Sequence, residues 1–472
     1  MSESISTTPT PEPFHWEPQS AAQALVHRLA GEFLDRIDDA ATLAHRMRHE
    51  TGARFVDWLD FIEVPEGGES PGLAREELQA SGFISTGDRT PTGAEIFENT
   101  EGIFPRLILS SDGARRIGVK VEFVADFLAA WSITNDHQIS GEPFAPVRFA
   151  PAFVDTKSGA ELWVVERHGY RGFEVGEPDP AKSIRAMQHL ESLRRRERDW
   201  ENDDDGWTRV FELVDRAIED LGPDRAADIF FTAEREYWQR RNRAARIQKS
   251  RQDALGLGWA NHDHHTYRST RMNFHRLIEL FERLGMRCRE RFYAGAEAGW
   301  GAQVLEQPNA GIVVFADVDL SPEEIAGDFA HHPIPPRDWL GTVGLWCGLH
   351  GESVLQSGMH HLECQFDHEA LCDQLAAAGV NTMAPFTNLP YLRQAFTEGE
   401  RWKVSEKRIA RLLEANLITS NQAMQFRMHG AIGSHLENLE RNDGYKGFNQ
   451  KGVSDIIHRT DPRRDNAELV GA

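Results

Sequence analysis

The chain has 472 residues, of which 40% are hydrophobic, so it is long enough to form two or three globular domains. Its 74 acidic and 52 basic residues give a formal net charge of −22, which disfavours nonspecific binding to nucleic acid or to anionic membranes. No apolar run is long enough to cross a bilayer. The four cysteines lack the paired spacing of a thiolate zinc site or a disulfide framework, and this favours a reducing, cytoplasmic location.

The first part of the chain mixes helical and strand patterns. Residues 1–19 are rich in Ser, Thr, Pro and Glu, which predicts a disordered tail rather than a secretion signal. Within residues 20–177, Leu25, Leu29 and Phe33 recur at the i+4 spacing of an amphipathic helix. Strands are expected at 54–64, 117–123, 147–153 and 161–167.

Residues 178–256 have the pattern of charged helices. We expect helices at 184–200, 208–221 and 226–249, with the acidic run 202–206 as a stop between the first two. Acidic residues interleave the arginines of the third helix, so we interpret the segment as a solvated helical insertion rather than a nucleic-acid surface. A cap over a pocket and a dimer surface both fit this pattern.

Residues 257–462 show the order strand, helix, strand, strand, strand over 259–318, and the order begins again at 360. The second unit is expected to have strands at 360–366, 423–428 and 435–441 and helices at 368–378 and 405–415. The segment 161–173 can also be laid over the residues around Glu437, so that Glu437 aligns with Trp163. Such self-similarity is typical of a duplicated unit. Residues 463–472 are expected to form a second tail.

Three segments of the C-terminal part carry candidate metal ligands. Two are rich in histidine, 261–268 and 358–364, and the third, 434–441, contains Glu437. Two imidazoles and one carboxylate form the facial set that holds non-haem Fe(II) and leaves coordination positions for substrate and dioxygen. His262 and His264 lie two residues apart on one expected strand face, so the spacing leaves both open as a ligand.

The duplicated βαβββ pattern resembles the vicinal oxygen chelate superfamily. This resemblance implies an α+β fold of duplicated βαβββ modules, with a degenerate first half (20–177), a helical insertion (178–256) and a catalytic second half (257–462). Around 358–361 and 436–441 the chain is similar to the 4-hydroxyphenylpyruvate dioxygenase family, whose motifs imply His361 and Glu437 as ligands. The segment 264–268 resembles a His-Gly-Ala-Ile-Arg motif of the 2-oxoadipate dioxygenase/decarboxylase family and implies His264 as the first ligand. The implied cofactor is Fe(II).

The same resemblances imply the substrate contacts. Two positions that sandwich an aryl ring in the 4-hydroxyphenylpyruvate dioxygenase family fall on Arg427 and Val453, which disfavours an aromatic slot. Arg427 and Arg268 would each pair with a carboxylate, as a dicarboxylic 2-oxo acid such as 2-oxoadipate requires. The further candidate contacts are Gln425, Arg393, Gln394 and Phe448.

The sequence therefore predicts a cytoplasmic Fe(II)-dependent dioxygenase that oxidatively decarboxylates and hydroxylates a 2-oxo acid. Its partners would be the small-molecule 2-oxo acid and dioxygen, with neither nucleic acid nor membrane involved, and a homodimer is the candidate assembly. The alternatives are a 4-hydroxyphenylpyruvate-type aryl 2-oxo acid dioxygenase, an extradiol dioxygenase, another metal-dependent enzyme of the same fold, and a non-catalytic binding protein.

Overall fold

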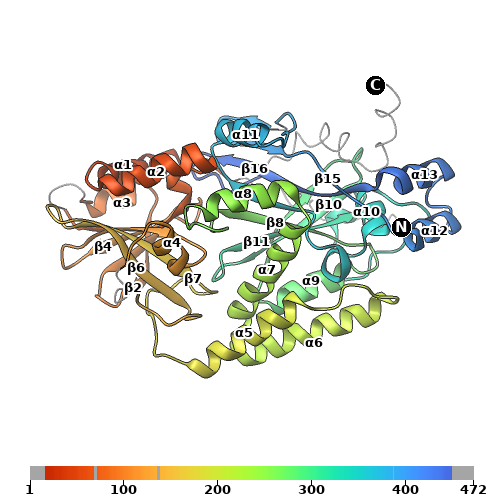
Figure 1. The fold of residues 1–472 in the computed structure, drawn as a ribbon, viewed down its shortest axis with the longest axis horizontal. Coiled ribbons are helices and arrows are strands. Elements are labelled where there is room, and N and C mark those ends of the chain that lie inside the picture. Colours follow the sequence, from red (N-terminus) through yellow and green to blue (C-terminus); the bar gives the residue numbers. More distant parts are fainter. Residues whose placement is uncertain (1–15, 68–71, 135–138, 386, 449–472) are drawn as a thin grey trace, which may run out of the picture.

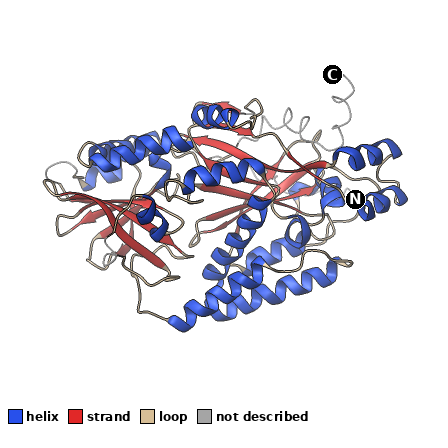
Figure 2. Cartoon of the chain, viewed as in Figure 1, coloured by secondary structure: helices blue, strands red, loops and turns tan. Residues whose placement is uncertain are grey.

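The computed structural model describes residues 16–67, 72–134, 139–385 and 387–448 (Figure 1). The first β-sheet lies at one end of the molecule's long axis and the second lies nearer its middle, and helices pack beside both (Figure 2). Most of each predicted tail, and Val453, lie outside the described residues. Among the described residues, the structure has no helix that is both long and apolar enough to cross a membrane.

The first sheet has the strand order β2-β3-β4-β1-β5-β7-β6. Strand β1 pairs parallel with β4 and antiparallel with β5, while β5 pairs parallel with β7. This gives a βαβββ unit from β1 to β4 and, in the part of the chain that the structure describes, a βαββ unit from β5 to β7. The elements are α1 (Ser20–Leu34), α2 (Asp38–Thr51), β1 (Leu59–Pro65), α3 (Arg75–Ala80), β2 (Ile84–Arg89), β3 (Glu95–Glu98), β4 (Arg106–Ser110), β5 (Arg115–Lys120), α4 (Val124–Ala130), β6 (Val147–Asp155) and β7 (Ala160–Arg167).

Four helices connect the two sheets: α5 (Pro180–Arg194), α6 (Asp203–Leu221), α7 (Pro223–Arg240) and α8 (Arg243–Asp253). The single helix predicted at 226–249 is two helices, because Asn242 has an extended backbone and its side chain accepts a hydrogen bond from the Ala245 N–H, which starts α8. The acidic run predicted as a stop forms the first turn of α6, where carboxylates stabilise the helix N-terminus. Helix α7 packs Phe231 against His265 and Tyr267 of the second sheet.

The second sheet has the order β13-β14-β16-β12-β8-β11-β10-β9, and β15 pairs with β16. Strand β8 pairs parallel with β11, β12 pairs parallel with β16, and β8 and β12 are antiparallel neighbours. Two βαβββ units therefore share the sheet, β8-α9-β9-β10-β11 and β12-α11-β13-β14-β16. The elements are β8 (His262–Arg268), α9 (Phe274–Arg283), β9 (Arg287–Tyr293), β10 (Trp300–Gln307), β11 (Ile312–Asp319), α10 (Thr342–His350), β12 (His361–Gln365), α11 (His368–Ala377), β13 (Thr387–Leu389), β14 (Leu392–Phe396), β15 (Glu400–Trp402), α12 (Glu406–Glu414), α13 (Ser420–His429) and β16 (Ala431–Arg441).

The predicted fold class, α+β with duplicated βαβββ modules and a helical insertion between the halves, is confirmed by this topology. The strand predicted at 423–428 is wrong, because this segment belongs to helix α13. Thr419 and Gln422 form a capping box at its start, and Gly430 adopts a positive φ after its end.

Candidate metal centre

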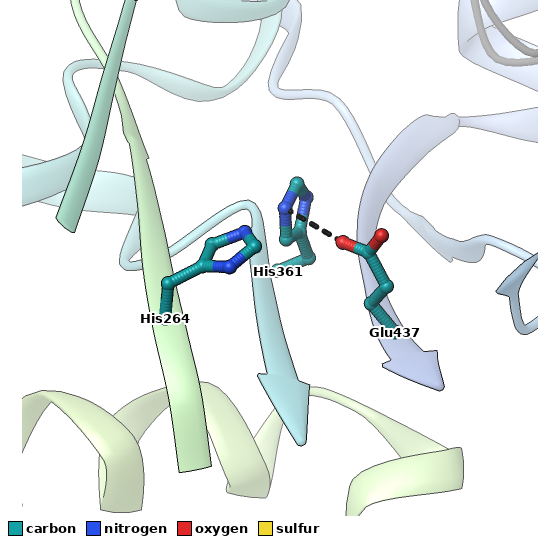
Figure 3. A group of neighbouring side chains, drawn as sticks. All are labelled: His264, His361 and Glu437. Carbon is teal, nitrogen blue, oxygen red and sulfur yellow. Dashed lines mark ion pairs between the residues drawn. The ribbon is translucent and has the colours of Figure 1, made fainter. Parts of the chain in front are cut away.

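Three adjacent strands in the middle of the second sheet, β8, β12 and β16, carry the predicted metal ligands (Figure 3). Glu363 of β12 pairs with His264 on one side and with Glu437 on the other. His361 precedes Glu363 by two residues, and side chains two apart on a strand point to the same face. The register therefore brings His264, His361 and Glu437 to one face of the sheet.

The donor atoms of His264, His361 and Glu437 all lie within 4.8 Å of one another. His361 Nε2 is 3.2 Å from Glu437 Oε2, and the rings of His264 and His361 meet edge to face with centroids 5.7 Å apart. All three residues are buried. The structure thus gathers two imidazoles and one carboxylate in a buried position.

His361 is in a state suited to metal binding. Burial, together with the nearby His264, holds the pKa of His361 well below its usual value, so the imidazole is neutral and keeps a lone pair. Its Nε2 lies 2.7 Å from Thr266 Oγ1, and its buried Nδ1 has no hydrogen-bond partner among the described residues. A cation held between His361 and Glu437 would contact Nε2, the nitrogen that lies 3.2 Å from Glu437 Oε2.

His264 is oriented by two carboxylates. Its Nδ1 is 3.0 Å from Glu363 Oε1 and 3.4 Å from Asp263 Oδ2. Burial lowers the pKa of His264, but the charges of Glu363 and Asp263 outweigh burial and raise it to about 9. Because these contacts engage Nδ1, Nε2 is the nitrogen that would bind a metal.

Two carboxylates, Glu437 and Glu363, lie side by side. Gln394 Nε2 donates to both, at 3.0 Å from Glu363 Oε2 and 3.3 Å from Glu437 Oε1. Burial and the adjacent Glu363 raise the pKa of Glu437 well above its usual value. A divalent cation would neutralise this buried pair, so the donor set fits such an ion. Glu363 was not among the predicted site residues, although its position two residues after His361 places it on the same strand face.

Asp263 is itself held by Arg441. Arg441 Nε and Nη2 each lie 3.0 Å from an Asp263 carboxylate oxygen, and Gln365 Nε2 donates to Asp263 at 2.8 Å. Burial opposes ionisation, but Arg441 outweighs it and holds the pKa of Asp263 well below its usual value. Asp263 therefore remains an anion beside His264.

His262, the other candidate for the first ligand, does not join the cluster. The pairing of β8 with β12 is irregular after Glu363, so that Asp263 rather than His262 lies beside His264. The His262 ring packs against His265, with centroids 5.2 Å apart, and His265 faces helix α7.

Three of the predicted substrate contacts lie near the cluster. Gln394 bonds to Glu437, and the Phe448 ring meets the edge of His264 at 5.5 Å. Arg268 is buried four residues after His264 on the same strand, with Nε 3.6 Å from Asp317 Oδ2. Asp317 is a further residue that the sequence did not indicate.

The other three predicted substrate contacts do not reach the cluster. Arg427 and Gln425 lie on helix α13 rather than on a strand, and the exposed Arg427 pairs with Glu406 at 2.9 Å. Arg393 is adjacent to Gln394 on β14 and therefore points to the opposite face, where it pairs with Glu369. The expectation that Arg427, Gln425 and Arg393 face a substrate is corrected by these positions.

The first sheet has the same register without the ligands. Phe61, Gly118 and Trp163 are paired there as His264, Glu363 and Glu437 are in the second sheet. The alignment of Trp163 with Glu437 agrees with this register. At these positions the candidate metal-binding side chains are present only in the second sheet.

No protein-family model matches the sequence, and no curated protein matches it. Among solved structures, the chain is similar to a variant of 4-hydroxymandelate synthase from Streptomyces coelicolor, with 12% identity over 86% of this chain and 97% of that one and a TM-score of 0.25. It is also similar to methylmalonyl-CoA epimerase from Mycobacterium tuberculosis, with 14% identity over 39% of this chain and 88% of that one and a TM-score of 0.22. Similarities this weak carry no argument about activity. The strand order itself, with two βαβββ units in one sheet, is the arrangement that the resemblance to the vicinal oxygen chelate superfamily implied.

Proposed function

We propose that the chain is a non-haem Fe(II)-dependent dioxygenase that acts on a 2-oxo acid. The observation that supports this most directly is the convergence of the buried donors of His264, His361 and Glu437 within 4.8 Å of one another. Two histidines and one carboxylate with open positions are typical of non-haem Fe(II) oxygenases. Fe(II), when bound, would supply the coordination positions at which dioxygen and the 2-oxo acid react.

The chain's own residues would orient the ligands and exclude water. Glu363 and Asp263 hold the ring of His264, and Gln394 holds the carboxylate of Glu437. Phe315 and Phe448 pack on His264 with centroids 4.5 and 5.5 Å away, which keeps that side of the centre apolar. In the proposed reaction, the 2-oxo acid and one dioxygen give carbon dioxide and a hydroxylated acid shorter by one carbon.

The position of Arg268 supports a dicarboxylic 2-oxo acid such as 2-oxoadipate as the substrate. The Arg268 guanidinium is buried on the strand that carries His264, where it would pair with the substrate carboxylate that is far from the keto group. Arg427 lends no support, because it lies exposed on α13.

An aryl 2-oxo acid is the second candidate. Three phenylalanine rings lie against the ligand imidazoles, since Phe396 packs on His361 at 5.2 Å while Phe315 and Phe448 pack on His264. Such rings would suit an aromatic substrate.

Oxygen uptake and carbon dioxide release by the iron-loaded protein test the proposal, with 2-oxoadipate and 4-hydroxyphenylpyruvate as substrates. Release of one carbon dioxide per dioxygen consumed, with either substrate, supports the proposed dioxygenase. The substrate with the higher kcat/KM decides between a dicarboxylic and an aryl 2-oxo acid. Cleavage of a catechol ring without carbon dioxide would indicate an extradiol enzyme, and tight binding without turnover a binding protein.

Iron content provides a second test. His361→Ala and Glu437→Ala should each lose iron while keeping the wild-type circular dichroism spectrum. The matched controls His429→Ala and Glu414→Ala change exposed residues and should retain iron. Full iron retention in both ligand variants would overturn the assignment.

A further inference from the structure

A second group of potential metal donors lies at the edge of the second sheet, apart from the three predicted iron ligands. Glu282 is at the end of α9, Cys288 is in the edge strand β9, and His331 is in the loop between β11 and α10. Their donor atoms all lie within 4.8 Å of one another.

The donor types are those that zinc prefers. His331 Nε2 is 3.1 Å from Glu282 Oε1, and Cys288 Sγ is 3.9 Å from the same oxygen. Thiolate, imidazole and carboxylate are the protein ligands of Zn²⁺, and three of them with one open position make a common four-coordinate set. All three side chains are partly exposed, so an ion could reach them from solvent.

The histidine is oriented by a neighbouring carboxylate. His331 Nδ1 lies 2.9 and 3.0 Å from the two oxygens of Asp328, whose Oδ1 also accepts the backbone N–H groups of Ala330 and His331. This fixes Nδ1 as the donor to Asp328 and turns Nε2 toward Glu282 and Cys288. Zinc-bound histidines have this same carboxylate partner on their second nitrogen.

The loop that carries His331 is held in place without a metal. Phe329 stacks on Phe274 of α9, with centroids 5.8 Å apart and an interplanar angle of 24°. Arg271 Nε donates to the Pro335 carbonyl at 2.8 Å, and Arg291 Nη1 donates to the Ile325 carbonyl at 3.1 Å. These contacts position the three donors in advance, which lowers the entropic cost of binding an ion.

The local charge also favours a cation. The carboxylates of Glu282 and Asp328 both lie within 3.1 Å of a ring nitrogen of His331. A divalent ion would neutralise these two carboxylates and stabilise a thiolate at Cys288.

We propose that Glu282, Cys288 and His331 bind a zinc-class cation that fastens the loop between β11 and α10 to the edge strand β9. An ion that binds the native state but not the unfolded chain stabilises the fold. The proposal is independent of the iron centre.

Cobalt(II) added to the full-length protein tests the site, because a thiolate bound to cobalt has a charge-transfer absorption band in the near ultraviolet. The wild type and the iron-site variant His361→Ala should both show the band. Cys288→Ser should lose it, whereas Cys372→Ser, which changes a cysteine outside the site, should keep it. Asp328→Asn should weaken zinc binding about 10–100-fold, since it removes the carboxylate that orients His331.

Thermal unfolding supplies a second readout. In the His361→Ala background, which removes a ligand of the proposed iron centre, zinc should raise the melting temperature, and it should still do so when Cys372→Ser is added. This rise should vanish when Cys288→Ser or His331→Ala is added to His361→Ala. A cobalt band that survives in Cys288→Ser, or zinc stabilisation that survives in His361→Ala/His331→Ala, would overturn the proposal.

Discussion

Arg441 and Arg167 make the same contacts in the two halves of the chain. Arg441 binds both carboxylate oxygens of Asp263 and donates to the carbonyls of Tyr445 and Gly447. Arg167 binds both carboxylate oxygens of Asp60 and donates to the carbonyls of Tyr170 and Gly172. Asp263 precedes His264, whereas Asp60 precedes Phe61, so this arginine clamp occurs with and without a metal ligand beside it.

The clamp predicts that Asp60→Asn and Asp263→Asn have similar effects on stability and different effects on metal binding. Each removes the charge partner of an arginine that is buried (Arg441) or partly buried (Arg167), which should lower the free energy of unfolding by about 3 kcal/mol in urea titrations. Asp263→Asn should also weaken iron binding about 10–100-fold, because Asp263 contacts His264. Competition with a chelator measures this affinity, and an equal loss in Asp60→Asn would contradict the prediction.

Glu363 is expected to serve the site rather than the fold, because the equivalent residue of the first sheet is Gly118. Glu363→Ala should weaken iron binding about 10–100-fold, and Glu363→Gln by less, since its amide keeps a polar side chain of the same size beside His264 Nδ1. The control is Glu63→Gln, another buried carboxyl, which pairs with Arg116 in the first sheet. If Glu63→Gln weakens iron binding as much as Glu363→Ala, the role of Glu363 is disproved.

The strands of the candidate site were the most predictable part of the fold. The sequence could place β8, β12 and the end of β16 because each is a short run bounded by turn residues, although these strands are buried along most of their length and do not alternate. The two-module order followed from these strands and from the helices α9 and α11 between them. The structure then brings His264, His361 and Glu437 together, as the resemblance implied.

Other features depend on information that a sequence pattern does not carry. Strand β2 is exposed along its whole length, so it has no apolar alternation to detect. The irregular pairing that puts Asp263 beside His264 depends on the register of β12, a strand far away in the sequence. Helix α13 was predictable from the capping box of Thr419 and Gln422, and missing it led to the wrong placement of Arg427.

If Arg268 binds a distal carboxylate, its substitution should matter only for substrates that have one. Arg268→Lys loses bidentate geometry and should raise KM for 2-oxoadipate about tenfold, which corresponds to one weakened charged hydrogen bond. KM for 2-oxohexanoate, which has a methyl group in place of that carboxylate, should change little. Arg427→Lys is the control and should leave both KM values unchanged. Equal changes for the two substrates in Arg268→Lys would show that the residue acts through the fold.

Asp317 should make stability depend on pH. Burial raises the pKa of its carboxyl to about 7, although Arg268 opposes this, so between about pH 4 and 7 the native state holds a proton that the unfolded chain has lost. Because the native state binds more protons, the contribution of Asp317 to stability falls as pH rises through this window, by up to about 1.4 kcal/mol per pH unit. The Asp317→Asn variant has no titrating group at this position, so it serves as the reference. The free energy of unfolding of the wild type, measured in urea relative to Asp317→Asn, should therefore be lower at pH 7 than at pH 5, and a higher value at pH 7 would mean that the native carboxyl is ionised throughout.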